Sequence, residues 1–135
     1  MIVSELTELR VIDVFDRGEP NKECVAIKIY ETLNIGRYGI MLGSYAGGNS
    51  AVPYRDQLYW FGNGFVKAED WIFVYTGSGE PRKALQQNSV NHTYTVYWGR
   101  PTTLFADSHV VPMLIRIDAV DVLQPKGNLP QLGQT

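Results

Sequence analysis

The chain has little of what stabilises or anchors many small proteins. Its 135 residues include one cysteine, Cys24, so no disulfide can form within the chain. Cys24 lies in a strand-like run, and we expect a packed thiol and not a nucleophile. No apolar run approaches the roughly 18 residues that span a membrane. Residues 1–5 lack the basic region and apolar core of a signal peptide, so we expect a soluble, cytoplasmic chain without a membrane partner.

Groups that carry catalysis or bind polyanions are also scarce. The net charge is -2, and no basic cluster is larger than the pair at residues 82–83, so a nucleic-acid partner is disfavoured. Asp107, Ser108 and His109 have the letters of a hydrolase triad, but sequence neighbours rarely face one another as a triad requires. The glycine-rich residues 76–80 lack the helix N-terminus of a phosphate site. We therefore predict a protein with no enzymatic activity, no metal site and no cofactor.

What the sequence does have is a succession of short runs rich in β-branched and aromatic residues. Residues 71–75 are all aromatic or β-branched and end at the turn formers Gly77 and Gly79. We expect this run to be a central strand buried on both faces or nearly so. Further strands are predicted over residues 7–15, 24–31, 38–42, 57–61, 93–98 and 113–122.

The pattern predicts a single all-β domain. About eight short strands separated by turns are typical of a β-sandwich or barrel. We assign residues 1–123 to the sandwich and residues 124–135 to a loosely ordered C-terminal tail. Residues 43–53 are expected to be a mobile loop, and residues 63–64 (Asn-Gly) the turn of a β-hairpin. Strict alternation along residues 7–15 would place Leu9 and Val14 on opposite faces.

Two motifs resemble the lamin-tail domain, a family of immunoglobulin-like β-sandwiches. Residues 69–79, followed by Tyr97-Trp98-Gly99, are similar to a strand of this family that ends in Thr-Gly-x-Gly and to its later aromatic–Trp pair. Residues 21–27 resemble its Asn-Asp-Glu-x-Val-x-Ile strand. The resemblance implies an immunoglobulin-like β-sandwich over residues 8–122 that acts as a non-catalytic interaction module.

Aromatic residues between positions 54 and 98 are the one functional signal. Tyr59-Trp60-Phe61 and Tyr97-Trp98 are consecutive. Because neighbouring residues of a strand face opposite sides, some of these rings should reach the outside unless they cap the core or pack under loops. The predicted binding surface consists of Tyr59, Trp60, Phe61, Tyr97 and Trp98.

Two functions of different classes fit such a surface. The first is a non-enzymatic module that binds protein, including a homodimer in which Trp60 or a neighbouring ring loses its exposure. The second is a carbohydrate-binding module that stacks sugars on coplanar rings. A flat row of rings beside polar groups would favour sugar, and a contiguous apolar patch would favour protein. Residues 57–61 carry no charge, and we expect either the loop 43–53 or a second chain to cover them.

Overall fold

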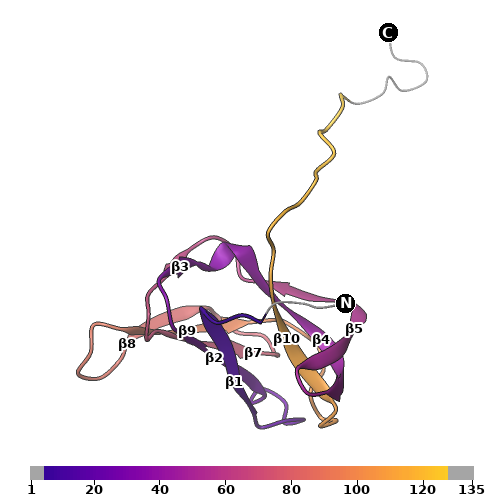
Figure 1. Ribbon diagram of the computed structural model, residues 1–135. Coiled ribbons are helices and arrows are strands. Elements are labelled where there is room, and N and C mark those ends of the chain that lie inside the picture. Colours follow the sequence, from indigo (N-terminus) through magenta and orange to yellow (C-terminus); the bar gives the residue numbers. More distant parts are fainter. Residues whose placement is uncertain (1–4, 128–135) are drawn as a thin grey trace, which may run out of the picture.

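The computed structural model describes residues 5–127 and shows two β-sheets packed against each other (Figure 1). The larger sheet consists, in spatial order, of β1 (Leu9–Phe15), β2 (Cys24–Ile29), β7 (Trp71–Tyr75), β9 (His92–Tyr97) and β8 (Arg82–Leu85). The smaller consists of β10 (Val110–Arg116), β4 (Tyr38–Gly47) and β5 (Ser50–Trp60). Two short strands, β3 (Leu33–Asn34) and β6 (Phe65–Val66), form a separate ladder.

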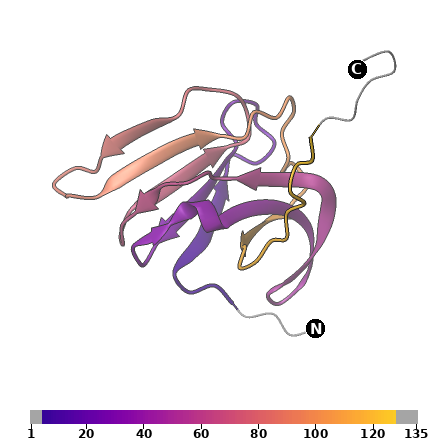
Figure 2. The same ribbon diagram turned by 90° about the horizontal axis from the view of Figure 1, so that it is seen from above.

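The described residues confirm the prediction of an all-β sandwich. Their only helical turn is the 3₁₀ turn η1 (Ile35–Arg37). Accordingly, residues 5–127 contain no helix long and apolar enough to cross a membrane. The β8–β9 end of the larger sheet extends beyond the smaller sheet (Figure 2).

The central strand is where the sequence predicts it. β7 pairs antiparallel with β2 and parallel with β9. Ile72 and Val74 are buried and pack in the core between the sheets. Burial on both faces is not observed, because Trp71, Phe73 and Tyr75 are only half-buried on the outer side of the sheet.

A β-bulge changes which residues of β1 reach the core. The pairing with β2 shifts between Val11 and Asp13, so Ile12 is an extra residue without a direct partner. Leu9 and Val14 are both buried as a result, while Ile12 is exposed. The expectation that Leu9 and Val14 lie on opposite faces is therefore wrong.

The prediction of a mobile loop over residues 43–53 is also wrong. These residues form the tip of a long hairpin in which Gly43 pairs with Pro53. Gly47 and Gly48 have φ values of 98° and 54°, as a tight turn between strands requires. A side chain at Gly43 would lie 2.5 Å from the sulfur of Met113 on β10. Gly43 is therefore a strand residue against which the Met113 side chain packs. Because residues 43–53 belong to the same sheet as β5, they do not fold over β5 as a covering loop.

Two further boundaries differ from the predictions. Asn63-Gly64 is not the turn of a two-strand hairpin, because β6 pairs with β3 and not with β5. The Asn34 side chain joins Asn63-Gly64 to η1. Its Oδ1 accepts hydrogen bonds from the backbone N–H groups of Gly64 and Gly36, with distances of 3.2 and 2.8 Å. The last strand covers residues 110–116 and not 113–122, so residues 118–127 lie outside both sheets and are exposed.

Candidate interaction surfaces

The five aromatic residues predicted to bind do not form one surface. Tyr59, Phe61 and Trp98 pack against the core, with the Tyr59 ring 5.3 Å from that of Phe61 and 5.6 Å from that of Trp98. Trp60 is exposed on the outer side of the smaller sheet. Tyr97 stacks on Tyr75 on the outer side of the larger sheet, at 5.5 Å between ring centroids. The structure therefore separates the two outward rings, Trp60 and Tyr97, onto different sheets.

The outer side of the smaller sheet is apolar across all three strands. Met113 of β10 pairs with Met41 of β4, which pairs with Leu58 of β5. Since directly paired residues share a face of the sheet, these side chains form one row. In the next row Ile115 and Trp60 flank Gly39. We call this surface the apolar face and define it as Met41, Leu58, Trp60, Val111, Met113 and Ile115.

Close contacts at two glycines show how tightly the apolar face is packed. A Cβ atom at Gly39 would lie 3.1 Å from the Leu58 side chain. The corresponding atom at Gly43 would lie within 3.0 Å of the Met113 side chain. Leu58 and Met113 therefore lie against the backbone of β4, where glycine leaves room for them.

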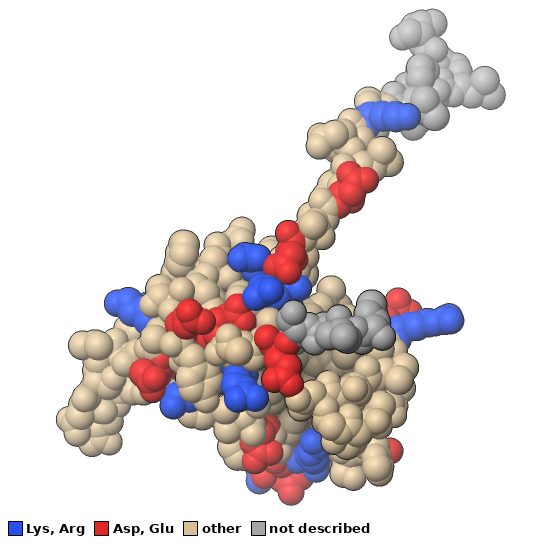
Figure 3. Space-filling model, in the orientation of Figure 1, with Lys and Arg blue, Asp and Glu red and all other residues tan. Residues whose placement is uncertain are grey.

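Trp60 is held in place at the edge of this face. Its indole Nε1 donates a hydrogen bond of 2.7 Å to the carbonyl oxygen of Gly36 in η1. The polar atom of the ring is satisfied within the chain, so the rest of the ring offers only apolar area. Leu58 is 50% exposed and Trp60 is 53% exposed. Figure 3 shows that the part of the body over β4 and β5 is mostly free of charged side chains.

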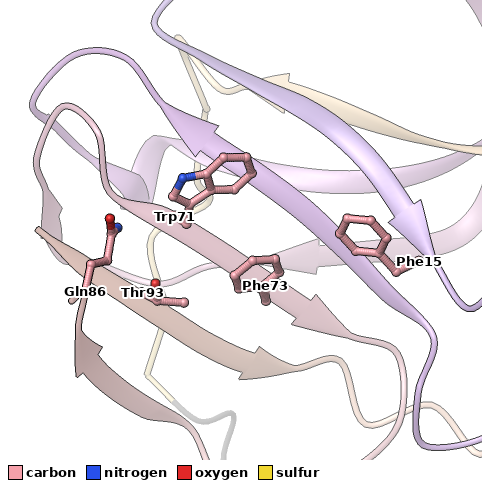
Figure 4. A pocket seen from close by; sticks show the side chains of 5 residues that line it. All are labelled: Phe15, Trp71, Phe73, Gln86 and Thr93. Atoms are coloured by element: carbon pink, nitrogen blue, oxygen red, sulfur yellow. The ribbon is translucent and has the colours of Figure 1, made fainter.

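The outer side of the larger sheet carries a second surface, which we call the aromatic face. It consists of Phe15, Trp71, Phe73, Tyr75 and Tyr97. The rings of Trp71 and Phe73 are 5.9 Å apart and within 8° of parallel. A shallow hollow of about 300 Å³ opens here, and Gln86 and Thr93 line it beside three of the rings (Figure 4).

Small buried residues lie beneath the aromatic face. Ala26 pairs with Phe73, and Cys24 pairs with Tyr75. Both small residues are buried, and the outward rings of Phe73 and Tyr75 are paired directly with them. Burial, reinforced by the nearby carboxylate of Asp16, raises the pKa of the Cys24 thiol to about 12. The thiol is therefore protonated at neutral pH, which agrees with a packed and unreactive cysteine.

Lys28 gives the aromatic face one cation. Its Nζ lies 5.9 Å from the centroid of the Trp71 ring and 5.3 Å from that of Tyr30. The same Nζ lies 3.3 Å from a carboxylate oxygen of Glu69. The ammonium group thus contacts one carboxylate and two rings at the edge of the aromatic face.

A buried carboxylate that the sequence did not single out, Glu23, joins three segments. Its oxygens accept hydrogen bonds from the backbone N–H groups of Gly18, Leu104 and Phe105, with distances of 2.7, 2.6 and 3.0 Å. They also accept one of 2.8 Å from the Thr76 hydroxyl. The only signal for this role was the motif at residues 21–27.

Asp70, which directly precedes β7, is a second buried carboxylate. It accepts hydrogen bonds from the backbone N–H groups of Lys67 and His92, at 2.8 and 2.9 Å, and from the Asn91 amide at 3.0 Å. Burial raises the pKa of Asp70, but these hydrogen bonds outweigh burial and leave its pKa below its usual value. Both carboxylates hold loops in place through several hydrogen bonds each.

The residues that resemble a hydrolase triad form a turn. Asp107 Oδ1 accepts a hydrogen bond of 2.9 Å from the backbone N–H of His109, as in an Asx-turn. His109 is exposed. Within residues 5–127, no three His, Cys, Asp or Glu side chains are placed to hold a metal ion together.

The two outer faces differ in chemistry. The apolar face presents no charged side chain at its six positions, whereas Lys28, Gln86 and Thr93 border the aromatic face. A contiguous uncharged patch is typical of protein contacts. Rings flanked by polar groups suit the binding of small ligands.

A comparison of the sequence with known protein families found no matching family model, and a search of curated proteins found no match.

Proposed function

We propose that this protein is a non-enzymatic interaction module that binds protein through the apolar face. One observation carries the proposal: six outward positions on three adjacent strands are all apolar. An antiparallel sheet with one face in water normally alternates apolar and polar residues. Here the inward residues of the same strands, such as Ile40 and Leu114, already form the core. The smaller sheet thus has the composition of a sheet covered on both sides.

The free energy available from covering this face is substantial. Complete burial of a Leu, Met or Ile side chain contributes roughly 1.5–3 kcal/mol. Leu58 and Trp60 are about half exposed, so each would contribute about 1 kcal/mol or more when covered. Residues of this kind, an aromatic ring surrounded by aliphatic side chains, are those that dominate protein interfaces.

The partner that we propose is a second copy of the chain. A two-fold axis would bring the same patch of each subunit into contact. The hairpin of β4 and β5 forms part of the smaller sheet itself, so it does not shield Trp60. The sequence suggested two ways to cover residues 57–61, the loop 43–53 or a second chain, and the second chain is the one that remains.

The lamin-tail resemblance and the immunoglobulin-like identity belong to this proposal. They are supported by the positions of the motif residues, because Glu23, Asp70 and Thr76 anchor the loops at the ends of the central strands. Domains of that family are generally interaction modules, and a non-catalytic role here agrees with the engaged state of both buried carboxylates.

Light scattering at tens of micromolar tests the proposal. The wild type should be dimeric, and Leu58→Glu should give folded monomers because a charge would be buried in the contact. Ile12→Glu is the matched control, since Ile12 is exposed on the other sheet. A monomeric wild type would exclude self-association, and a dimer that tolerates Leu58→Glu would move the interface elsewhere.

Carbohydrate binding is the second candidate function, and the hollow of the aromatic face favours it. Trp71 and Phe73 are nearly parallel, and Gln86 and Thr93 lie beside them (Figure 4). A sugar ring could stack on these side chains while its hydroxyl groups bind the amide and the hydroxyl. A glycan array with wild type and Trp71→Ala tests this function. Glycan binding that Trp71→Ala removes and Leu58→Glu retains would support it, and a blank array would exclude it.

A further inference from the structure

The chain leaves the sandwich after β10 as an extended segment. Figure 1 shows residues 117–127, in orange to yellow, projecting from the body, and Figure 2 shows the same segment from above. Val120, Val122 and Leu123 are 74%, 67% and 85% exposed. In the described part of the chain, no hydrogen bond joins residues 119–127 to the sandwich. Three large apolar side chains are thus presented to water on a segment without a partner.

The base of this segment is tied down. The backbone N–H of Ile117 donates to the carbonyl oxygen of Arg37 at 2.6 Å. Asp118 Oδ1 accepts hydrogen bonds from the guanidinium groups of Arg37 and Arg116, at 2.7 and 2.9 Å. The segment therefore begins at a defined place beside η1.

The free part has the pattern of a strand with one apolar side. In an extended chain Val120 and Val122 point to the same side, and Asp121 points to the other. β-Branched residues favour this conformation. Residues 119–123 could therefore lie on an apolar surface while keeping their one charge in water.

We propose that Val120 and Val122 of one copy lie on the apolar face of a second copy, and that the same segment of the second copy makes the equivalent contact with the first. The inference rests on the proposed function and names the occupant of its binding surface. Both parts of the contact have the same character: the face is uncharged and apolar, and the segment offers apolar side chains with an unpaired backbone.

The apolar face and the base of the tail both lie next to η1, so a single two-fold axis could bring each tail to the face of the other copy. Trp60 at the edge of the apolar face is bonded to Gly36, and the base of the tail is bonded to Arg37. A two-fold axis near η1 would set each tail beside the face of the other copy. Residues 119–127, extended at about 3.3 Å per residue, reach about 30 Å, whereas three strands spaced at about 4.8 Å are only about 10 Å across. The tail is long enough to cross the face.

Two full-length variants test the exchange in a way that separates it from simple face-to-face packing. The tail variant is Val120→Asp/Val122→Asp, and the face variant is Leu58→Asp. Each should raise the dimer Kd by on the order of 100-fold, because charges would enter the contact. Gln124→Asp is the matched control, since it adds a charge to the same segment beyond the apolar residues. Circular dichroism should show that every variant remains folded.

Mixing the two variants gives the sharpest result. The face variant has an intact tail and the tail variant has an intact face, so a heterodimer restores one of the two contacts that each variant alone lacks. Sedimentation of the mixture should therefore show heterodimers at concentrations at which each variant alone is monomeric. A tail variant that dimerises like the wild type would overturn the exchange and leave the apolar face as the interface. A mixture that stays monomeric would also overturn it. A monomeric wild type would overturn self-association and the exchange together.

Discussion

The Glu23 carboxylate and the Thr76 hydroxyl are joined by a hydrogen bond of 2.8 Å in the interior of the protein. Glu23 lies directly before β2, and Thr76 directly after the neighbouring strand β7. Three backbone N–H groups from two other segments donate to the same carboxylate. One side chain thus holds together one end of the larger sheet and the loop before β10.

Replacing Glu23 should be costly. Glu23→Ala would leave the Thr76 hydroxyl and three backbone N–H groups without their acceptor, and each unsatisfied buried group costs about 1–3 kcal/mol. We expect a loss of several kcal/mol in the free energy of unfolding, measured with urea. Glu31→Ala, at an exposed position, is the control and should change little. A loss below about 1 kcal/mol for Glu23→Ala would show that water replaces the carboxylate.

Asp70 should make the free energy of unfolding fall at acidic pH. Burial raises its pKa, but hydrogen bonds from His92, Lys67 and Asn91 bring the folded-state pKa below the ordinary value of 3.8. A carboxylate with a lowered folded pKa stabilises the protein above its unfolded pKa, and this contribution is lost as the pH falls through the folded pKa. Asp70→Asn should therefore lower stability at pH 7 and weaken the decline below about pH 4. Urea unfolding from pH 7 to pH 3 measures both, and unchanged acid dependence in the variant would contradict the assignment.

Val74→Asp tests the central strand. Val74 is 0% exposed between the sheets, so the variant would bury an unpaired charge at a cost of several kcal/mol, against a total stability of roughly 5–15 kcal/mol. Thermal unfolding should show a severe loss or no folded protein. Ile12→Asp, at an exposed position on β1, should melt close to the wild type. A Val74→Asp protein that melts within a few degrees of the wild type would mean that this side chain faces water.

The Cys24 thiol should be inert while the protein is folded. Its pKa is raised to about 12 by burial and by Asp16, and the rings of Phe15 and Tyr75 lie beside it on the sheet. A disulfide reagent at pH 8 should react with the native protein far more slowly than with the urea-unfolded chain. Equal rates would show that the outer rings do not cover the thiol.

How far the sequence predicts the fold depends on whether the determining contact is local. The alternation within residues 71–75 is enough to identify β7, because Ile72 and Val74 face the core wherever the strand lies. The strand character of Gly43 cannot be read locally, since it depends on pairing with Val111 of β10 and Pro53 of β5. The bulge at Ile12 is likewise visible only in the pairing with β2.

The interaction surface was only partly predictable for the same reason. Alternation correctly implies that Trp60 faces away from Tyr59, but it does not say which of them faces the core. The rest of the apolar face depends on a register across three strands, in which Met113, Met41 and Leu58 align although they are far apart in the sequence. Tyr97 and Trp98 belong elsewhere because β9 lies in the other sheet.

The methionines give the most direct measurement of whether protein covers the apolar face. Met41 and Met113 occupy neighbouring strands at its centre, so their ¹³C-labelled methyl groups report on that surface and no other. In a dilution series from hundreds of micromolar downwards, both methyl signals should shift, and both should be protected from a soluble paramagnetic probe only at high concentration. Leu58→Glu should remove the protection. Methyl groups that stay equally accessible to the probe at every concentration in the wild type would contradict coverage of the apolar face by a second copy.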